Sequence, residues 1–325
     1  MFALTRRRWV ASALALATTP VSAWARHGGS GLSFPLFDAH AHLKSDDRVN
    51  YPRAPAAPAL PGPPPPQPSG ETPEVVRVLR WMDQNGVGGG AAVQHRGTYG
   101  TDNRYLLDST DQYRHRLVPI VVLDAEDPTT PGAVHRLVEE HGIAGIRLTG
   151  PHAADGSLPW LESTAAQRTW TALNAAGLVA DLMTLPPGFS VAAMAAYARL
   201  ARAYPRVRLV LDHCAWPDAA GAPEFGLRAE HRALLATANV YFKFTTVNLE
   251  LLRSANASPR DALRHFAAML GAHRLMWGSD IGNSAGLYAE MVSRIVAAAS
   301  GLSRGDRRLL LHDTGQAVMV AGGIH

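Results

Sequence analysis

This chain of 325 residues has few of the features that hold a protein together by covalent bonds or by charge. It contains one cysteine, Cys214, so no disulfide can form within the chain. Only 18% of its residues are charged, and no basic segment carries interleaved aromatic residues, which disfavours nucleic acid as a partner. The composition is 47% hydrophobic, so the core of one large domain has to hold the fold.

The single cysteine directly follows His213, an arrangement in which a nucleophilic thiol is conceivable. Free cysteine more often packs as a small apolar side chain. We therefore predict that the Cys214 thiol is buried and inert.

The first 25 residues have the composition of a targeting segment. Arg6 and Arg7 precede a mildly apolar run that ends in Ala-Trp-Ala at 23–25, which resembles a twin-arginine signal. An uncleaved membrane anchor is the alternative, but the run is short and Pro20 interrupts it. We predict cleavage near Ala25 and export to the periplasm, with no membrane span left. Removing three Arg and no Asp or Glu lowers the formal charge from +4 to +1.

A proline-rich segment interrupts the otherwise regular chain. Ten of the 22 residues from Pro52 to Pro73 are proline, which favours extended polyproline II and excludes a helix or a central strand. A domain linker is one interpretation. A long loop over a functional site fits better, because the apolar run before the segment has no core of its own.

Apolar runs typical of strands alternate with helical patterns over the rest of the chain. The expected strands are 34–40, 89–94, 117–123, 143–148, 178–183, 207–213, 239–244 and 274–279. Helical spacing of apolar residues recurs at 74–85, 189–204 and 286–299. Eight strand–helix units predict a single-domain (β/α)8 barrel over residues 26–325, with the proline-rich loop after its first strand.

A doubly wound open sheet is the alternative fold. It would be supported by a glycine-rich phosphate loop directly after a strand. No G-x-G-x-x-G follows an expected strand, and the glycine run at 88–90 precedes one, so a phosphate cradle is unsupported.

The pattern Asp38-Ala-His40-Ala-His42 closes the first expected strand. Alternate residues of a strand project to one side, so these three side chains are expected to share a face. Two imidazoles and a carboxylate aimed at one spot can bind a metal or polarise a carbonyl group.

Polar residues also stand at other strand ends, where (β/α)8 barrels carry their chemistry. In chain order the expected ring is Asp38, His40, His42, Gln94, His95, Arg147, His213, Lys243 and Asp280. We leave out His95, because alternation directs it away from Gln94. The convergence of His and Asp from three strand ends predicts an enzyme.

These motifs resemble the amidohydrolase superfamily: Asp-x-His-x-His at 38–42, Asp-His at 212–213 and Trp-Gly-Ser-Asp at 277–280. Further segments are similar to its 2-pyrone-4,6-dicarboxylate lactonase branch. They are Tyr51-Pro52, Val93-Gln94, Tyr99 to Arg104, Leu106 to Asp108, Gly145 to Arg147, and Lys243 after a Val-Tyr pair. The likeness runs from about residue 34 to 320 and implies a barrel whose site opens lactones without a metal.

Three departures from that branch concern the substrate. Ala215-Trp216-Pro217 stands where the branch usually has Gly-Arg-Pro, and Asn248 lies near the place of a second basic residue. Ile281-Gly282 replaces a Trp-Pro pair. Two missing cations indicate that a dicarboxylate is not the substrate.

The resemblance also suggests roles for the residues. Asp280 would act as general base, while His40, His42 and His213 would polarise the lactone carbonyl. Substrate contacts are expected from Arg147, Tyr51, Gln94, Tyr99, Asn103 and Lys243. For Arg147 and Lys243, an ion pair within the barrel is the alternative.

Metal-dependent superfamily members add a histidine on strand 5, which is absent at 178–183. No cofactor is therefore expected. If zinc is bound instead, the predicted ligands are His40, His42, Asp280 and His213. Alternative functions are a metal-dependent decarboxylase or hydrolase of the same superfamily, a sugar-lactone isomerase, and a non-catalytic exported binding protein.

Overall fold

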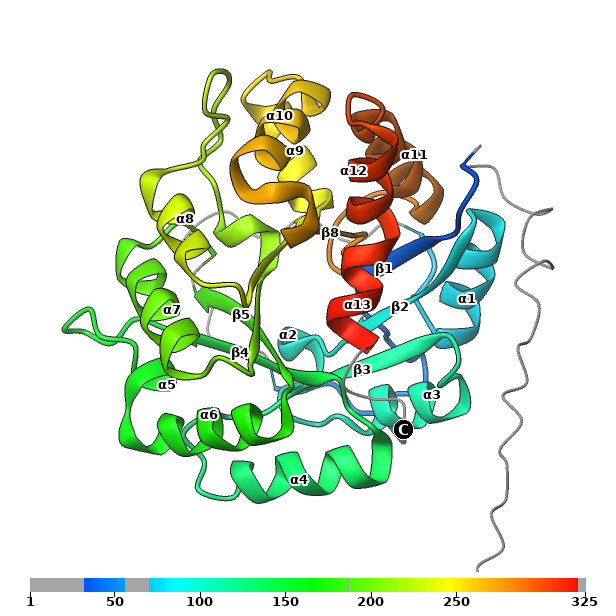
Figure 1. Ribbon diagram of the computed structural model, residues 1–325. Helices are drawn as coiled ribbons and strands as arrows, with labels where there is room; N and C mark the ends of the chain where they lie inside the picture. Colours follow the sequence, from blue (N-terminus) through cyan, green and yellow to red (C-terminus); the bar gives the residue numbers. More distant parts are fainter. Residues whose placement is uncertain (1–31, 56–69, 186, 321–325) are drawn as a thin grey trace, which may run out of the picture.

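Eight parallel strands pair in chain order to form the barrel. The computed structural model describes residues 32–55, 70–185 and 187–320. The strands are β1 (Leu36–Ala41), β2 (Val87–Val93), β3 (Leu117–Val122), β4 (Gly145–Pro151), β5 (Val179–Leu185), β6 (Arg208–Leu211), β7 (Val240–Thr245) and β8 (Leu275–Gly278). Helices surround them (Figure 1), so the predicted (β/α)8 fold is confirmed.

Helices follow every strand. Their bounds are α1 (Val75–Gln84), α2 (Arg96–Tyr99), α3 (Arg104–Gln112), α4 (Thr130–His141), α5 (Pro159–Glu162), α6 (Thr164–Ala176), α7 (Val191–Ala203), α8 (Ala229–Ala233), α9 (Thr246–Ser254), α10 (Pro259–Phe266), α11 (Tyr288–Ala299), α12 (Arg304–Arg308) and α13 (Thr314–Val320). The three helices expected at 74–85, 189–204 and 286–299 are α1, α7 and α11, each within two residues of its predicted ends.

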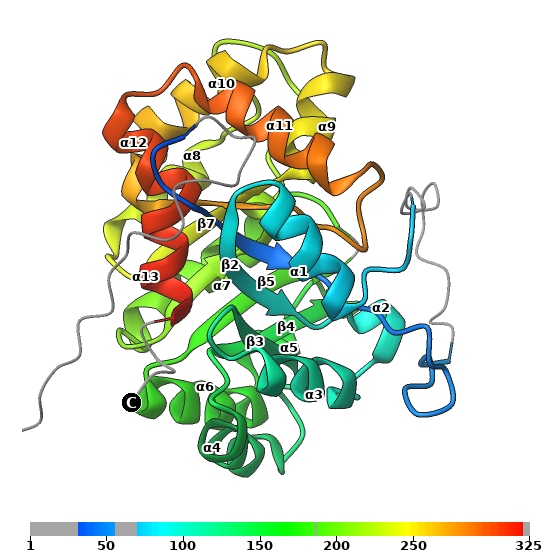
Figure 2. The ribbon, with the colours of Figure 1, turned by 90° about the vertical axis from the view of Figure 1, so that its right-hand side faces the viewer.

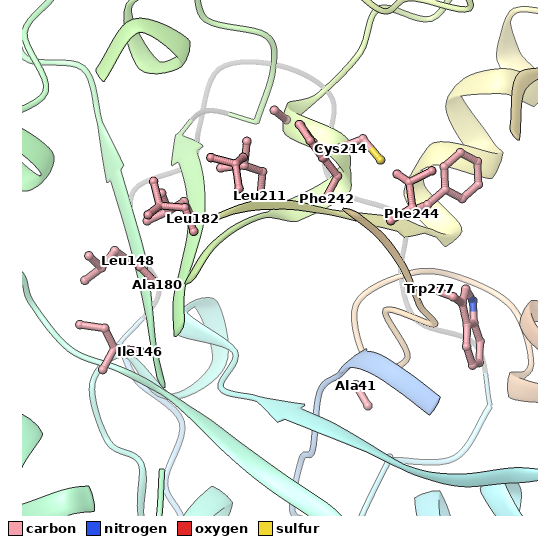
Figure 3. Packing of buried hydrophobic residues seen from close by; sticks show 14 of the residues in the cluster. Ala41, Ile146, Leu148, Ala180, Leu182, Leu211, Cys214, Phe242, Phe244 and Trp277 are labelled. Atoms are coloured by element: carbon pink, nitrogen blue, oxygen red, sulfur yellow. The ribbon is translucent and has the colours of Figure 1, made fainter. Parts of the chain in front are cut away.

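Two apolar clusters form the core. The larger one lies between the strands and the surrounding helices, and Figure 3 shows some of its side chains, such as Ile146, Leu182 and Phe244. The smaller one takes residues from seven strands or their edges, and Val318 and Met319 of α13 join it. Figure 2 shows α13 and α2 at opposite ends of the barrel, with the arrowheads of β1 and β2 directed toward α2. The α13 end is therefore closed by apolar packing, which leaves the other end for polar groups.

The seam between β8 and β1 explains the position of Asp38. Its carboxylate accepts hydrogen bonds from the Ser279 amide (2.8 Å) and from the Tyr288 hydroxyl of α11 (3.0 Å). The register between β1 and β2 shifts between Asp38 and Ala41. The expectation that Asp38 shares a face with the two imidazoles is therefore wrong. The Asp38 carboxylate is bonded to helix α11 instead, because the irregularity after Asp38 breaks the simple alternation of side chains.

The glycines at 88–90 lie within β2, which begins at Val87, and not before the strand as the sequence suggested. Close approach of the neighbouring strands explains why glycine occupies this position. A Cβ atom on Gly90 would lie 2.3 Å from the Asp38 carbonyl oxygen, so only a residue without a side chain fits.

Two predicted segments lie outside the described residues. They are the signal at 1–25 and the central part of the proline-rich loop at 56–69, whose flanks connect β1 to α1. Among the helices that are described, none has both the length and the apolar character needed to cross a membrane.

We expect Gly90→Ala to lower the free energy of unfolding by about 1–3 kcal/mol, because the added methyl group overpacks the β1–β2 backbone. The control is Gly132→Ala in α4, where an added Cβ meets nothing within 4 Å and the helix gains up to about 1 kcal/mol. Urea denaturation of both variants tests this; equal stability of the two would contradict the packing argument.

Candidate active site

Three imidazoles and one carboxylate meet at the polar end of the barrel. His40 lies on β1 and His42 just beyond it, His213 follows β6, and Asp280 follows β8. Nitrogen and oxygen atoms of His40, His213 and Asp280 lie within 4.8 Å of one another. The Oδ1 atom of Asp280 is 3.2 Å from His42 Nε2 and 3.4 Å from His40 Nε2. The structure thus brings the four predicted catalytic residues together, and all four are buried.

The backbone that carries two of these residues is strained. Residues 213–216 all have positive φ angles, from 52° at His213 to 57° at Trp216, and Asp280 has a φ of 59°. Such left-handed conformations cost roughly 1–2 kcal/mol for each non-glycine residue. Asn248 compensates in part, since its Nδ2 donates to the His213 carbonyl oxygen at 2.8 Å. Retained strain of this kind concentrates at functional sites.

Cys214 lies within this strained turn, but its thiol is not in a reactive environment. Its thiol is buried and lies 3.3 Å from the carbonyl oxygen of Lys243, to which it donates. Burial raises the pKa of Cys214 well above its ordinary value, so the reactive thiolate is disfavoured. The prediction of a buried thiol is confirmed.

The hydrogen-bond partner of His42 determines where its proton sits. Its Nδ1 atom lies 2.8 Å from the Val93 carbonyl oxygen, which can only accept, so Nδ1 carries the hydrogen. Burial lowers the pKa of His42 to about 3, so the ring is neutral at ordinary pH. Its Nε2 atom therefore presents a lone pair. The expectation that His42 polarises a carbonyl by donating does not fit this geometry.

Asp280 faces that lone pair as a carboxylate. Burial alone would raise the pKa of Asp280, but the neighbouring imidazoles, His40 first among them, outweigh burial and hold the pKa well below its ordinary value. The Oδ2 atom accepts from Asn283 and Ser284, at 2.9 and 2.6 Å. The Oδ1 atom has no well-aligned hydrogen bond among the described residues, and neither has His42 Nε2. Two buried acceptors 3.2 Å apart require a proton donor or a cation beside them, in contact with both atoms.

A buried ion network lies directly beneath the imidazoles. Lys243 Nζ donates to both oxygens of Asp181 at 2.7 Å, and it lies 3.3 Å from Asp212 Oδ1 and 2.9 Å from His40 Nδ1. Arg147 donates to Asp212 Oδ2 from Nε and Nη2, at 3.0 and 2.7 Å. Both cations are thus engaged by carboxylates, as in the alternative that the sequence left open for them.

Asp181 and Asp212 were missed as site residues. A signal for both was present, because a charged residue inside an apolar strand needs a buried partner. Asp181 stands opposite Arg147 in the β4–β5 register, and Asp212 directly precedes His213.

Gln94 and Asn103 use their amide groups to hold loops at the mouth. Gln94 Nε2 donates to the Asp102 carbonyl oxygen at 2.6 Å. Asn103 bonds both backbone groups of Val122, donating to its oxygen and accepting from its nitrogen at 2.9 Å each. Neither contacts the four central residues in these bonds, so their role in substrate binding stays a prediction.

Tyr51 and Tyr99 also have protein partners. The Tyr51 hydroxyl donates to Asp108 at 2.8 Å, and the Tyr99 hydroxyl accepts from the Ser45 amide at 2.8 Å. These bonds tie the loop after β1 to α2 and α3. Contact of either tyrosine with substrate likewise stays a prediction.

His95, which we excluded from the sequence, lies beside the centre. Its ring centroid is 4.9 Å from that of His42, and its Nε2 atom is 3.2 Å from Asn283 Oδ1. Strand β2 ends at Val93, so the alternation used to exclude His95 does not extend to it.

The centre also fits a divalent cation. His40 Nε2, His42 Nε2 and Asp280 Oδ1 are buried atoms without a hydrogen-bond partner among the described residues. With His213 they form a nitrogen and oxygen donor set of the kind that zinc takes. A second cluster, formed by His40, Asp181 and Asp212, is already bridged by the Lys243 ammonium.

The chain belongs to the amidohydrolase family, whose model matches residues 37–318. It is 28% identical over 186 residues to an L-fucono-1,5-lactonase of Burkholderia ambifaria, an alignment that spans 55% of this chain and 60% of the lactonase.

Solved structures share the fold at lower identity. A probable 2-pyrone-4,6-dicarboxylic acid hydrolase of Acinetobacter baumannii is 18% identical with a TM-score of 0.64, covering 88% of this chain and 100% of that one. An amidohydrolase of Burkholderia multivorans with bound zinc is 22% identical with a TM-score of 0.64, covering 88% and 99%.

We expect Lys243→Met to lower the free energy of unfolding by about 3–5 kcal/mol, because it leaves Asp181 and Asp212 buried with one cation fewer. The control is Arg294→Met, which removes a partly exposed ion pair with Glu250 and should cost less than about 1 kcal/mol. Urea denaturation measures both; a small loss for Lys243→Met would show that the network does not depend on its ammonium group.

Proposed function

We propose that this protein hydrolyses lactones to hydroxy acids. The observation that carries the proposal is the pair of buried acceptors, His42 Nε2 and Asp280 Oδ1, 3.2 Å apart. A water molecule can donate one hydrogen to each atom and direct an oxygen lone pair at a carbonyl carbon. The partial alignment with a lactonase supports a cyclic ester as the compound attacked.

In the proposed reaction, Asp280 takes a proton from the attacking water. His40 acts on the carbonyl oxygen of the lactone. The Lys243 ammonium, which can only donate, faces His40 Nδ1 at 2.9 Å, and this leaves Nε2 to face the substrate. Burial and Lys243 alone would lower the pKa of His40, but Asp212 and Asp280 raise it above its ordinary value. His40 Nε2 therefore carries a proton, which can be donated to the developing oxyanion. Removing one such donor typically costs about 3–4 kcal/mol of transition-state stabilisation.

His213 is the proposed second donor, with its ring held by Thr245, whose Oγ1 lies 2.7 Å from Nδ1. Burial lowers the pKa of His213 to about 4, so it is neutral at ordinary pH. When the tetrahedral intermediate collapses, the bond from the carbonyl carbon to the ring oxygen breaks. The proton held by Asp280 passes to that oxygen, and the product is an open hydroxy acid.

We expect Asp280→Asn to lower kcat at least a hundredfold, because an amide cannot take up the proton from water. The melting temperature should change little, since the amide oxygen can still accept from Ser284. The control is Asp313→Asn, at a surface ion pair with Arg308. The rate of lactone hydrolysis is measured from the protons that the product acid releases. A near-normal rate for Asp280→Asn would show that this residue is not the base.

A metal-dependent hydrolase is the second candidate, favoured by the fit of the donor set. His40, His42, His213 and Asp280 would hold the ion. A bound divalent ion would polarise the carbonyl and lower the pKa of a bound water. Lys243 favours the metal-free alternative, because it directs the His40 proton to Nε2 and so occupies the atom that would bind the metal.

We therefore expect protein purified without chelators to contain well below one equivalent of zinc or manganese. Its lactonase rate should be unaffected by prolonged dialysis against EDTA. Elemental analysis by mass spectrometry measures the content. One equivalent of metal, lost together with activity on dialysis and restored by the ion, would assign the second candidate.

A decarboxylase, a sugar-lactone isomerase and a binding protein stay as alternatives that product analysis would separate. We propose a small-molecule lactone as the partner, and export to the periplasm on the strength of the twin-arginine pattern at 1–25.

A further inference from the structure

A chain of hydrogen bonds leads away from the Asp280 carboxylate and ends at α2. Asn283 Nδ2 lies 2.9 Å from Asp280 Oδ2, and Asn283 Oδ1 lies 3.2 Å from His95 Nε2. On the other side of the same ring, His95 Nδ1 lies 2.6 Å from Thr98 Oγ1. None of these three side chains takes part in the proposed proton transfers.

The charge of Asp280 fixes the direction of the hydrogen bonds in this chain. An ionised carboxylate can only accept, so the Asn283 group that faces Asp280 Oδ2 is the amide nitrogen, which donates. The amide oxygen of Asn283 then faces His95 and needs a donor. His95 therefore carries a hydrogen on Nε2 and donates it to Asn283.

The neutral state of His95 extends the chain to α2. Burial lowers the pKa of His95 well below its ordinary value, so the ring carries a single hydrogen at ordinary pH. Because that hydrogen is on Nε2, the Nδ1 atom accepts the hydroxyl hydrogen of Thr98. Thr98 is itself held in place, since its carbonyl oxygen accepts from the Ala54 amide at 2.9 Å.

The chain acts on the orientation of the Asp280 carboxylate. Rotation of this carboxylate about its Cβ–Cγ bond would exchange Oδ2 with Oδ1, the oxygen that faces His42 at 3.2 Å. Asn283 and Ser284 oppose the rotation by donating to Oδ2, at 2.9 and 2.6 Å. A hydroxyl group can rotate to follow the carboxylate, whereas the Asn283 amide is held at its other end by His95.

His95 also packs on a neighbouring imidazole. Its ring centroid lies 4.9 Å from that of His42, and the two ring planes meet at 75°. The substitution His95→Phe would keep an aromatic ring for this edge contact but would have no hydrogen to donate to Asn283. The packing and the hydrogen bonding of His95 can therefore be separated by substitution.

We propose that His95 is a positioning residue for the general base of this site. Through Asn283 it holds the Asp280 carboxylate with Oδ2 bound and with Oδ1 free to take a proton from water. Thr98 supports this role by keeping the imidazole hydrogen on Nε2. The inference rests on the proposed lactonase activity and assigns to His95 a part that it plays only through Asn283.

The first test measures kcat and KM for the hydrolysis of δ-valerolactone. His95→Phe should lower kcat roughly tenfold, about the worth of one hydrogen bond, and should leave KM nearly unchanged. His95→Gln should recover most of the loss, because the amide nitrogen of glutamine can donate to Asn283 Oδ1 in place of Nε2. The control is His141→Phe on α4, which removes a half-buried imidazole bonded to Asp111 at 2.8 Å and should leave kcat unchanged.

Two kinetic results would overturn the inference. One is a normal kcat in His95→Phe, or a kcat in His95→Gln as low as in His95→Phe. The other is a rise in KM with kcat unchanged, which would show that His95 binds the substrate instead of holding the base. If His95→Phe does not fold, Thr98→Val and Thr98→Ser take its place. The valine variant should have the lower kcat, and equal values for the two would overturn the inference.

A measurement that needs no activity separates this inference from the proposed function. If wild-type protein hydrolyses no lactone, the lactonase proposal falls, and heteronuclear NMR still tests the hydrogen-bond chain. The His95 imidazole should carry hydrogen on Nε2 and none on Nδ1. The side-chain amide signals of Asn283 should shift in His95→Phe and stay in place in His141→Phe. Hydrogen on Nδ1 of His95, or Asn283 signals that His95→Phe does not move, would overturn the inference.

Discussion

The Lys243 ammonium group is the interaction on which the interior of this barrel depends. It joins Asp181 of β5 and Asp212 after β6 to His40 of β1, so one side chain from β7 connects four parts of the barrel wall. Burying this charge is tolerable only because carboxylates surround it and use all of its hydrogens. The same ammonium group faces His40 Nδ1 at 2.9 Å, so the network that joins the strands also contacts an imidazole of the candidate site.

This arrangement separates the barrel into two zones along its axis. At one end, α13 packs on an apolar cluster and closes the interior. At the other end, strained turns after β6 and β8 hold His213 and Asp280 close to the imidazoles of His40 and His42. The lone pair of His42 and the carboxylate of Asp280 then share a space that either a water molecule or a cation can fill. In the proposed function, the choice between the two depends on which nitrogen of His40 carries the proton, and hence again on Lys243.

Much of the architecture could be predicted because it follows from local patterns. Apolar runs of six or seven residues, alternating with helical spacing, predicted all eight strands within a few residues. The meeting of His40, His213 and Asp280 followed from the rule that strand ends share one face of a barrel. Asp38 and His95 were misplaced for one reason: side-chain alternation fails where a register shifts or a strand ends.

By itself, the sequence determined the number of strands, their order along the chain and the strand ends that carry imidazoles and carboxylates. These depend on residue type and periodicity, which are local. Only the tertiary structure decided which charges neutralise one another, which imidazole nitrogen keeps its lone pair, and which side chains hold the Asp280 carboxylate. Those properties depend on distances of a few ångströms between residues far apart in the chain, such as Lys243 and His40 at 2.9 Å, and periodicity carries no information about them.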